Sequence, residues 1–537
     1  MDGKYKKGLT FKVSIVLFLV TIGMSYPNGY FNVTDFGAIG NGTEPDTRAI
    51  QQTIDRCAER GGTIYFPPGT YLSGTLFLRS NVALYLDHGA ILLGSTRLED
   101  YPVQISEYRS YTDNYVVRSL IYAEKEHHIA IHGSGIIDGQ GAAFKDRRTA
   151  DNPYKDRPYL IRMIECRDVQ IRDITLVNSP MWVQHYLACD DLLIDGISVQ
   201  SHVAGNNDGI DIDACHRVRI ANCSVSSGDD AIVLKSTSDR PCKDVVITNC
   251  ILSSDCNAFK LGTESNGGFE RIVFSNCTIY DTRMTGIALE IVDGGMMQDV
   301  NVNNIVIDNA GTAIFIRLGN RGRPYLSRSS LRSSQTEPVI EKEPLKVGIL
   351  ERVRLHSIIA DGIGPTGCCI TGLPGYPIED IGLENIRITT RGGGEQRPIS
   401  DVPEHEKKYP EFNMFGPLPA YGFYIRHVKD LYIDRMQLSS DSPDARPALV
   451  FDNVADLEIS RFTASMNDTT AMIYLRDVDG AFVHGIRLVE DTFAVLNVEN
   501  SEDITIMNND LKRVKNVVIP ATAISEQSKK GNILPGE

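Results

Sequence analysis

The chain has 537 residues, a formal net charge of −15 and 42% hydrophobic residues. Its hydrophobic content and its 23% of charged residues are those of a folded globular protein, which excludes a largely disordered chain. The acidic balance argues against a nucleic acid or an anionic membrane as partner, because both attract clustered lysines and arginines.

The first 25 residues have the layout of a signal peptide. Several lysines precede an apolar run from Val13 to Met24, and the small residues Gly23 and Ser25 suit a cleavage site. The run is short for a membrane span, although an uncleaved anchor is the alternative. We therefore expect residues 1–25 to be removed and the mature chain to be secreted or periplasmic, with no membrane attachment.

Residues 26–60 are expected to form an N-terminal cap. A helix is predicted over Asp46–Glu59, with Ile50, Ile54 and Cys57 along one face. This apolar face would cover the open end of the repetitive structure that follows.

A repeat dominates the rest of the chain. Short segments rich in β-branched residues recur, each broken at an Asn: Val218–Val225, Val245–Leu252, Ile272–Ile279 and Val300–Ile307. Such a period of short strands indicates a solenoid, in which each coil buries its face only by stacking on the next. The predicted fold is all-β, a single-domain right-handed parallel β-helix over residues 61–537 with a short N-terminal capping helix.

Asn-Cys pairs mark these repeats at intervals of 27 residues, at Asn222, Asn249 and Asn276, and Asn303 continues the series. We expect the asparagines to form a buried ladder at one turn. The cysteines beside them are expected to be small packing residues rather than members of disulfides.

Two insertions poor in strand residues interrupt the coils, near residues 320–346 and 391–421. Loops of that length are usually functional or flexible. The second holds apolar and aromatic residues, so it is expected either to fold over a groove or to brace the solenoid.

Two carboxylate clusters lie about one coil apart. Asp208 belongs to Asn206–Asp213, and Asp229 and Asp230 follow after an offset of 21 residues from Asp208 to Asp229. Residues one coil apart stack at roughly 4.8 Å, so these carboxylates are expected to converge. Like charges at that distance hold one group protonated beside an ionised one, the pair that glycoside hydrolysis needs. Ordinary turns and a calcium site are the alternatives.

Several motifs together resemble glycoside hydrolase family 28, the polygalacturonase and rhamnogalacturonan hydrolase family. The similarity runs from about Phe31 to at least Gly322, through Asp35–Ala38, Gly61–Gly69, Gly135–Gly139, Asn178–Trp182, Asn206–Asp208 and Gly228–Asp230. The resemblance implies a pectin-lyase-like β-helix and inverting hydrolysis without a metal or other cofactor. It also implies Asp229 as general acid, with Asp208 and Asp230 as the bases that activate water.

The chain departs from polygalacturonases where they recognise the uronate. Asn257 stands in place of the His of a Gly-His-Gly motif, and Ala288 and Glu290 replace an Arg-x-Lys pair that holds the galacturonate carboxylate. A uronate carboxylate would lose its cationic partners and face a like charge. The site is therefore predicted to reject polygalacturonate.

Other residues are candidates for binding a sugar. Polar side chains that could replace the lost contacts, or that flank the aspartates, are Asn206, His202, Lys260, Glu264, Glu290 and Arg317. Lys260, Glu290 and Arg317 fall about one coil apart, so they are expected to share one face. A stacked ion-pair ladder on a solvated face is the alternative.

The predicted function is an exported glycoside hydrolase that acts on a plant-type glycan, pectic or rhamnose-containing. Its partner is a polysaccharide or oligosaccharide substrate, and the protein is expected to be a monomer. The alternatives are a polygalacturonase or exo-galacturonidase with re-sited carboxylate recognition, a polysaccharide lyase, and a catalytically silent glycan-binding β-helix.

Overall fold

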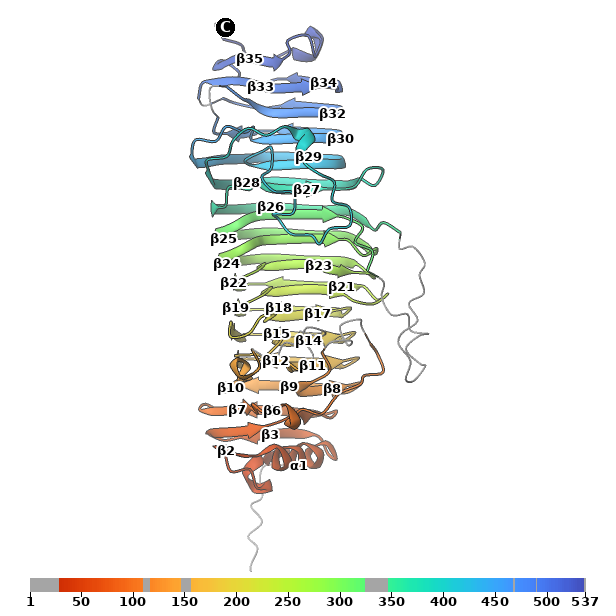
Figure 1. Ribbon diagram of the computed structural model, residues 1–537, viewed down its shortest axis with the longest axis vertical. Coiled ribbons are helices and arrows are strands. Elements are labelled where there is room, and N and C mark those ends of the chain that lie inside the picture. The colour runs from red at the N-terminus through yellow and green to blue at the C-terminus, as the bar shows by residue number, and fades with distance from the viewer. Residues whose placement is uncertain are drawn as a thin grey trace, which may run out of the picture.

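A computed structural model describes residues 29–109, 116–145, 156–323, 346–466, 469–488 and 490–535. The chain winds into an elongated stack of coils, with the N-terminal coils at one end and the C-terminal coils at the other (Figure 1). The predicted signal peptide and most of the first insertion lie outside the described residues. No helix in the described ranges has the length and apolar character needed to cross a membrane.

Three parallel sheets run along the stack. Most of the early coils contribute one strand to each sheet. The first sheet holds β1 (Tyr30–Asn32), β3 (Gly62–Phe66), β6 (Val82–Leu86), β9 (His127–Gly133), β12 (Arg167–Arg172), β15 (Asp190–Asp195), β18 (His216–Ala221), β21 (Cys242–Thr248) and β34 (Glu502–Met507). The second holds β2 (Asn41–Pro45), β4 (Gly69–Ser73), β7 (Ala90–Gly94), β10 (Ile136–Asp138), β13 (Thr175–Val177), β16 (Ser198–Ser201), β19 (Ser224–Ser227), β22 (Ile251–Ser254) and β31 (Thr463–Ala464). The third holds β5 (Leu76–Phe77), β8 (Ser119–Glu124), β11 (Tyr159–Ile164), β14 (Gln184–Leu187), β17 (Ile210–Asp213), β20 (Ile232–Ser236), β23 (Phe259–Ser265), β27 (Cys368–Thr371), β33 (Thr492–Glu499) and β35 (Val514–Ile519).

In later coils one strand continues around a corner from one sheet into the next. These long strands are β24 (Phe269–Ile291), β25 (Met296–Leu318), β26 (Ile349–Ile363), β28 (Ile378–Gly392), β29 (Phe423–Ser442), β30 (Leu449–Ser460) and β32 (Ala471–His484). All pairings between these named strands are parallel, so the predicted right-handed parallel β-helix is confirmed. Short 3-10 turns occupy Val33–Phe36, Leu98–Asp100, Gly141–Phe144, Ile399–Asp401 and Glu526–Lys529.

Alternation along each strand builds the core. In β18, Val218 and Ile220 point into the bore and are buried, while Arg219 between them is exposed. Val218 pairs in register with Val245 of β21, which pairs with Ile272 of β24. Stacked columns of β-branched and aliphatic side chains therefore fill the bore, which explains why the repeat is visible in the sequence.

The recurrent asparagines occupy a corner between the first and second sheets. Asn222, Asn249, Asn276 and Asn304 have φ angles between 53° and 57°, a left-handed conformation that Asn tolerates better than most residues. The Asn304 side chain donates to Asn276 at 2.8 Å. The expectation of a buried ladder continued by Asn303 was wrong: these side chains are exposed, and Ser275 pairs with Asn303, which aligns Asn276 with Asn304.

The prediction for the cysteines is confirmed. All eleven are free thiols, and Cys223, Cys250 and Cys277 are buried beside the corner asparagines. Their Sγ atoms donate to nearby backbone carbonyls, for example from Cys277 to Ser275 at 3.1 Å.

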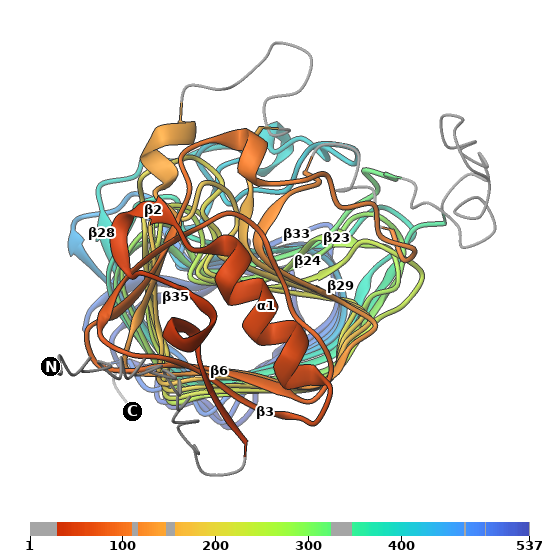
Figure 2. The ribbon, with the colours of Figure 1, turned by 90° about the horizontal axis from the view of Figure 1, so that it is seen from below.

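The helix α1 (Thr47–Ala58) lies across the N-terminal end of the bore (Figure 2). Ile50, Ile54 and Cys57 are buried, so one face of the helix covers the first coil. The Asp46 carboxylate bonds back to the N–H groups of Ile39 and Gly40 at 2.6 and 3.1 Å rather than to the helix.

The segment between β28 and β29 crosses the outer face of the third sheet. Its apolar side chains pack on outward-facing residues of β25, β27, β29 and β30, forming a second cluster of Phe315, Cys369, Ile399, Val402, Met414, Phe415, Leu418, Ala420, Tyr424 and Val450. The insertion therefore braces the solenoid, and it also limits where a ligand can reach this face.

Candidate active site

The carboxylates meet on the outer face of the third sheet, where the chain enters β17 and β20. Gly209 N donates to Asp230 O and Ala231 N donates to Asn257 O, each at 2.9 Å. In a parallel ladder this pattern stacks Asp208, Asp230 and Asn257 in successive coils. The member of the second cluster that stacks on Asp208 is therefore Asp230, one residue further along than the offset of 21 indicated.

Asp229 lies beside this column. Oxygen atoms of Asp229 and Asp230 and the Cys256 Sγ all lie within 4.8 Å of one another. The Asp229 Oδ1 accepts the Asp230 N–H at 2.9 Å, and its backbone carbonyl accepts the hydroxyls of Ser227 and Ser254 at 2.6 and 2.7 Å. Local hydrogen bonds thus fix the Gly-Asp-Asp turn, with Asp229 only partly buried and Asp230 buried.

Two buried lysines supply positive charge beside the aspartates. Lys235 Nζ lies 3.4 Å from Asp208 Oδ2 and 3.4 Å from Asp211 Oδ1. Lys260 Nζ lies 3.4 Å from Asp230 Oδ2. Lys260 was predicted to line this face, and the structure brings it to the carboxylates.

Neighbours move the pKa values of the two adjacent aspartates in opposite directions. Burial raises the pKa of Asp229, and the nearby Asp230 charge adds to that effect. Burial alone would raise the pKa of Asp230, but Lys260, Lys235 and a hydrogen bond from Asn257 Nδ2 at 2.8 Å outweigh it and lower that pKa. Asp229 is therefore suited to hold a proton while Asp230 stays ionised.

Asp208 has a different environment. Burial and the charge of Asp229 raise its pKa well above the usual value, although Lys235 opposes them. Its Oδ1 is buried and accepts no hydrogen bond within the described residues. Asp230 is thus the stronger candidate for the ionised base. Asp208 lies next to it, at the same position of the preceding coil.

Glu290 approaches the same lysine from the C-terminal side. Its Oε2 lies 3.9 Å from Lys260 Nζ, and the side chain is almost fully buried. Burial raises the pKa of Glu290 to about 8, against the opposing charge of Lys260. A neutral Glu290 can both donate and accept hydrogen bonds, as recognition of a sugar hydroxyl requires.

Glu264 lies on the other side of Lys235 from Asp208 and contacts two arginines. It lies 3.8 Å from Lys235 and 3.6 Å from Arg321, which is also paired with Asp293. Arg323, half exposed at the rim, lies 3.5 Å from Glu264. These arginines follow β25 directly and were not selected from the sequence.

The insertion between β28 and β29 delivers an aromatic ring to this group of side chains. Tyr409 accepts a hydrogen bond from Thr263 Oγ1 at 3.0 Å, and its ring centroid lies 5.7 Å from Lys260 Nζ and 5.6 Å from the guanidinium carbon of Arg321. The Tyr409 side chain remains 48% exposed. Glu411, two residues on, has a pKa raised to about 7 by burial and by Asp230 and Asp229.

Three predicted binding residues have other contacts. Arg317 stacks on Glu290, but its guanidinium donates to Thr371 Oγ1 at 3.1 Å and to the carbonyls of Gly372 and Glu404 at 3.1 and 2.9 Å. It therefore ties the insertion to the solenoid, beneath Phe415. The shared face predicted for Lys260, Glu290 and Arg317 is present, but the insertion covers the Arg317 end.

The other two lie on the loop before β17. Asn206 Oδ1 accepts from buried Arg157 at 2.9 Å, which anchors the loop. His202 is exposed, with Asp255 and Ser226 as partners at 2.9 Å each. Within the described residues, the side chains of Asn206 and His202 make no hydrogen bond to Asp208, Asp229 or Asp230.

Trp182 is buried against Lys235 and Tyr159. Its ring lies 4.6 Å from Lys235 Nζ and 5.7 Å from the Tyr159 ring, and the residue is only 6% exposed. It supports Lys235 through a cation–π contact.

The group Asp229, Asp230 and Cys256 has the spacing of a metal site. Lys260 already lies 3.4 Å from Asp230, and a hard cation such as calcium takes six or more oxygen ligands rather than a thiol. The donor set therefore does not fit calcium, the competing interpretation of the carboxylate clusters.

Two family models match the chain. A model described as glycosyl hydrolases family 28 matches residues 83–319, and one described as rhamnogalacturonase A/epimerase, pectate lyase-like, matches residues 30–97. A probable polygalacturonase of Vitis vinifera is 28% identical over 382 residues, covering 66% of this chain and 74% of that protein. An exo-poly-alpha-D-galacturonosidase of Dickeya chrysanthemi is 28% identical over 250 residues, covering 37% of this chain and 41% of that protein.

Solved structures show the same fold. An exopolygalacturonase of Thermotoga maritima superposes with a TM-score of 0.57 at 22% identity, covering 68% of this chain and 88% of that one. A family 28 exopolygalacturonase of Yersinia enterocolitica gives 0.58 at 21%, covering 85% and 78%. The family 28 model, matched over residues 83–319, the relatives and the aspartates on the third sheet together support a divergent member of glycoside hydrolase family 28.

Proposed function

We propose that the protein hydrolyses an O-glycosidic bond of a pectic glycan by an inverting, metal-independent mechanism. The proposal rests on two adjacent carboxyl groups whose pKa values shift in opposite directions: the pKa of Asp229 is raised and the pKa of Asp230 is lowered. Glycoside hydrolysis needs one protonated and one ionised carboxyl group at the bond that is cleaved. The inverting course is the one that the resemblance to family 28 implies; it does not follow from the carboxyl spacing, since oxygens of Asp229 and Asp230 lie within 4.8 Å of each other.

In this mechanism Asp229 donates its proton to the leaving oxygen. Asp230, held ionised by Lys260 and Asn257, removes a proton from the attacking water, with Asp208 beside it in the column. The bond from the anomeric carbon to the leaving oxygen breaks as the bond to the water oxygen forms on the opposite face. Inversion of the anomeric centre follows.

The charges of the cleft favour a scissile sugar without a carboxylate. Lys235, Lys260 and Arg321 are each already paired with acidic groups: Lys235 with Asp208 and Asp211, Lys260 with Asp230, and Arg321 with Glu264 and Asp293. An incoming uronate would have to displace one of these pairs. Glu290 and the exposed ring of Tyr409 instead offer a hydroxyl partner and an apolar surface, which suit rhamnose or another neutral sugar.

An exo-galacturonidase with re-sited carboxylate recognition is the second candidate, and Arg323 is the observation that favours it. This arginine is half exposed at the cleft rim, beside Glu264. A terminal uronate could pair with it without entering the buried network. We further propose that the mature protein acts as a monomer in a secreted or periplasmic location.

Product analysis tests the reaction class against a lyase on the same fold. Purified protein incubated with pectic fragments should release new reducing ends at an unchanged rate in the presence of a chelator, without an ultraviolet-absorbing unsaturated product. A lyase would yield the unsaturated product, and a silent glycan-binding protein would release no reducing ends; either result overturns the proposal.

A further inference from the structure

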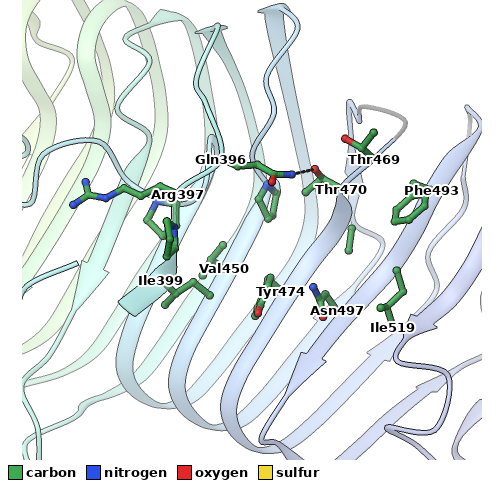
Figure 3. A pocket seen from close by; sticks show the side chains of 14 residues that line it. Gln396, Arg397, Ile399, Val450, Thr469, Thr470, Tyr474, Phe493, Asn497 and Ile519 are labelled. Atoms are coloured by element: carbon green, nitrogen blue, oxygen red, sulfur yellow. Dashed lines mark hydrogen bonds between the residues drawn. The ribbon is translucent and has the colours of Figure 1, made fainter. Parts of the chain in front are cut away.

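A cavity (Figure 3) lies on the same sheet of the solenoid as the candidate active site, beyond the insertion. It has a volume of about 460 Å³, within the range of ordinary ligand sites. Its floor is formed by one residue from each of four successive coils, namely Val450, Tyr474, Asn497 and Ile519.

The strand register connects this floor to the catalytic cleft. Starting from Lys260, the aligned positions in successive coils are Ala288, Phe315, Cys369, Tyr424 and then Val450. Five coil steps at roughly 4.8 Å place the two sites about 24 Å apart along one face. A long polysaccharide lying along the solenoid axis can therefore reach both.

The insertion separates the two sites and also forms part of each. Phe315, Cys369 and Tyr424, the aligned positions between the sites, are buried under it. Its first residues and Pro419 form a wall of the cavity, whereas Tyr409 stands at the catalytic cleft. Past the insertion the face opens again, and Tyr474, Phe493 and Asn497 are each partly exposed.

The cavity is lined by uncharged groups with one exception. Gln396 donates to Thr470 Oγ1 at 2.8 Å, and the Tyr474 hydroxyl bonds to Glu499 at the edge. Arg397, the charged residue of the lining, directs its guanidinium away from the other labelled side chains, and it donates to the backbone of Asp401 at 3.0 Å (Figure 3). Within the described residues the lining includes no acidic side chain.

We propose that this cavity, which we call the distal pocket, binds neutral glycosyl units of the polysaccharide whose scissile bond lies in the catalytic cleft. Two aromatic residues, Tyr474 and Phe493, supply apolar surface for a sugar ring, while the side-chain amides of Asn497 and Gln396 supply donors and acceptors for hydroxyl groups. In the described part of the chain, the lining side chains direct no charge into the cavity, and the two charges beside it have opposite signs: Glu499 at the Tyr474 hydroxyl, and Lys515 Nζ at 5.5 Å from the Phe493 ring centroid. This balance favours a neutral sugar over a uronate. The identity of the polymer rests on the proposed function, but binding at the pocket does not require turnover.

Linking two sites through one polymer raises the apparent affinity without any new contact, because binding at the second site becomes intramolecular. The distal pocket should therefore matter for a long chain and not for a disaccharide, which cannot span both sites. This length dependence separates a binding role from damage to the catalytic cleft.

The experiment measures retardation of the full protein in native gels that contain a neutral galactan, a neutral arabinan or polygalacturonic acid. We expect one neutral polymer to retard the wild type and the Asp229→Asn protein alike. Phe493→Ala and, separately, Asn497→Ala should each weaken that binding about tenfold. Phe482→Ala is the matched control: this phenylalanine is 37% exposed on another face of β32, and its loss should leave the retardation unchanged.

Thermal unfolding of each variant, and turnover of a disaccharide where one is hydrolysed, show whether the fold and the cleft remain intact. Equal retardation of wild type and both pocket variants would overturn the proposal, as would an absence of retardation by either neutral polymer. If the wild type hydrolyses no glycan yet Phe493-dependent retardation is present, the proposed function fails and the distal pocket stands.

Discussion

The Asp229→Asn protein is expected to fold normally and to turn over its glycan about 10²–10⁴-fold more slowly than the wild type, the usual contribution of a general acid. Folding should be unaffected, because the asparagine oxygen can still accept the Asp230 N–H and the serine bonds go to the backbone carbonyl. The amide has no proton to give the leaving oxygen.

The pH profile provides a second readout of the same variant. Because the pKa of Asp229 is raised, wild-type activity should persist until that group loses its proton on the alkaline side. Because the pKa of Asp230 is lowered, the acidic limit should lie below the usual range of an aspartate. Asp229→Asn should abolish the alkaline limb and keep the acidic one.

Asp244→Asn is the matched control for this substitution. Asp244 is exposed on the first sheet, where it pairs with Arg271 at 2.7 Å, so its replacement should leave turnover unchanged. Near-normal activity of purified Asp229→Asn would remove this residue from the acid role.

Polygalacturonate is expected to be cleaved at least about a thousandfold more slowly than the preferred glycan. Each charge-assisted hydrogen bond contributes roughly 1.5–3 kcal/mol. By its resemblance to polygalacturonases, the chain carries Ala288 and Glu290 where those enzymes have two cations. Losing two such contacts, together about 3–6 kcal/mol, corresponds to about two to four decades in kcat/KM at about 1.4 kcal/mol per decade, with a thousandfold in the middle of that range. Glu290 is buried and supplies no cation in their place.

Initial rates on polygalacturonic acid, rhamnogalacturonan fragments and neutral oligosaccharides measure this ratio. The Asp229→Asn protein serves as the blank, so that a contaminating hydrolase is recognised. Rapid cleavage of polygalacturonic acid by the wild type and not by the blank would contradict the prediction and favour a uronate bound at the rim by Arg323.

The repeat and the carboxylate clusters could be predicted because coil stacking converts sequence intervals into contacts. Lys260 and Glu290 were placed at the site in this way. In the structure Lys260 lies beside Asp230, and Glu290 lies beside Lys260. The same reasoning erred by one residue at Asp208, because this coil has 22 residues, as the pairing of Ile210 with Ile232 shows, and not the 21 that separate Asp208 from Asp229. Strand register, not the interval alone, decides which residues stack.

The residues contributed by the insertion could not be predicted in this way. Tyr409 contacts Thr263, which lies 146 residues earlier in the chain, and no coil period relates the two. Arg317 has the correct interval from Glu290, yet the apolar residues around Phe415 cover it and its guanidinium bonds to backbone carbonyls. The interval between coils predicts which face of the solenoid a residue occupies, but it does not predict whether an inserted segment covers that face.

Proton NMR of the first sugar released is the measurement that tests the acid/base mechanism most directly. An inverting mechanism, with Asp229 as acid and Asp230 activating water, predicts that the newly formed anomeric centre has the opposite configuration to the bond cleaved, before mutarotation mixes the two forms. Release with retained configuration would mean that one carboxylate attacks the sugar as a nucleophile, and would contradict the roles assigned to this pair.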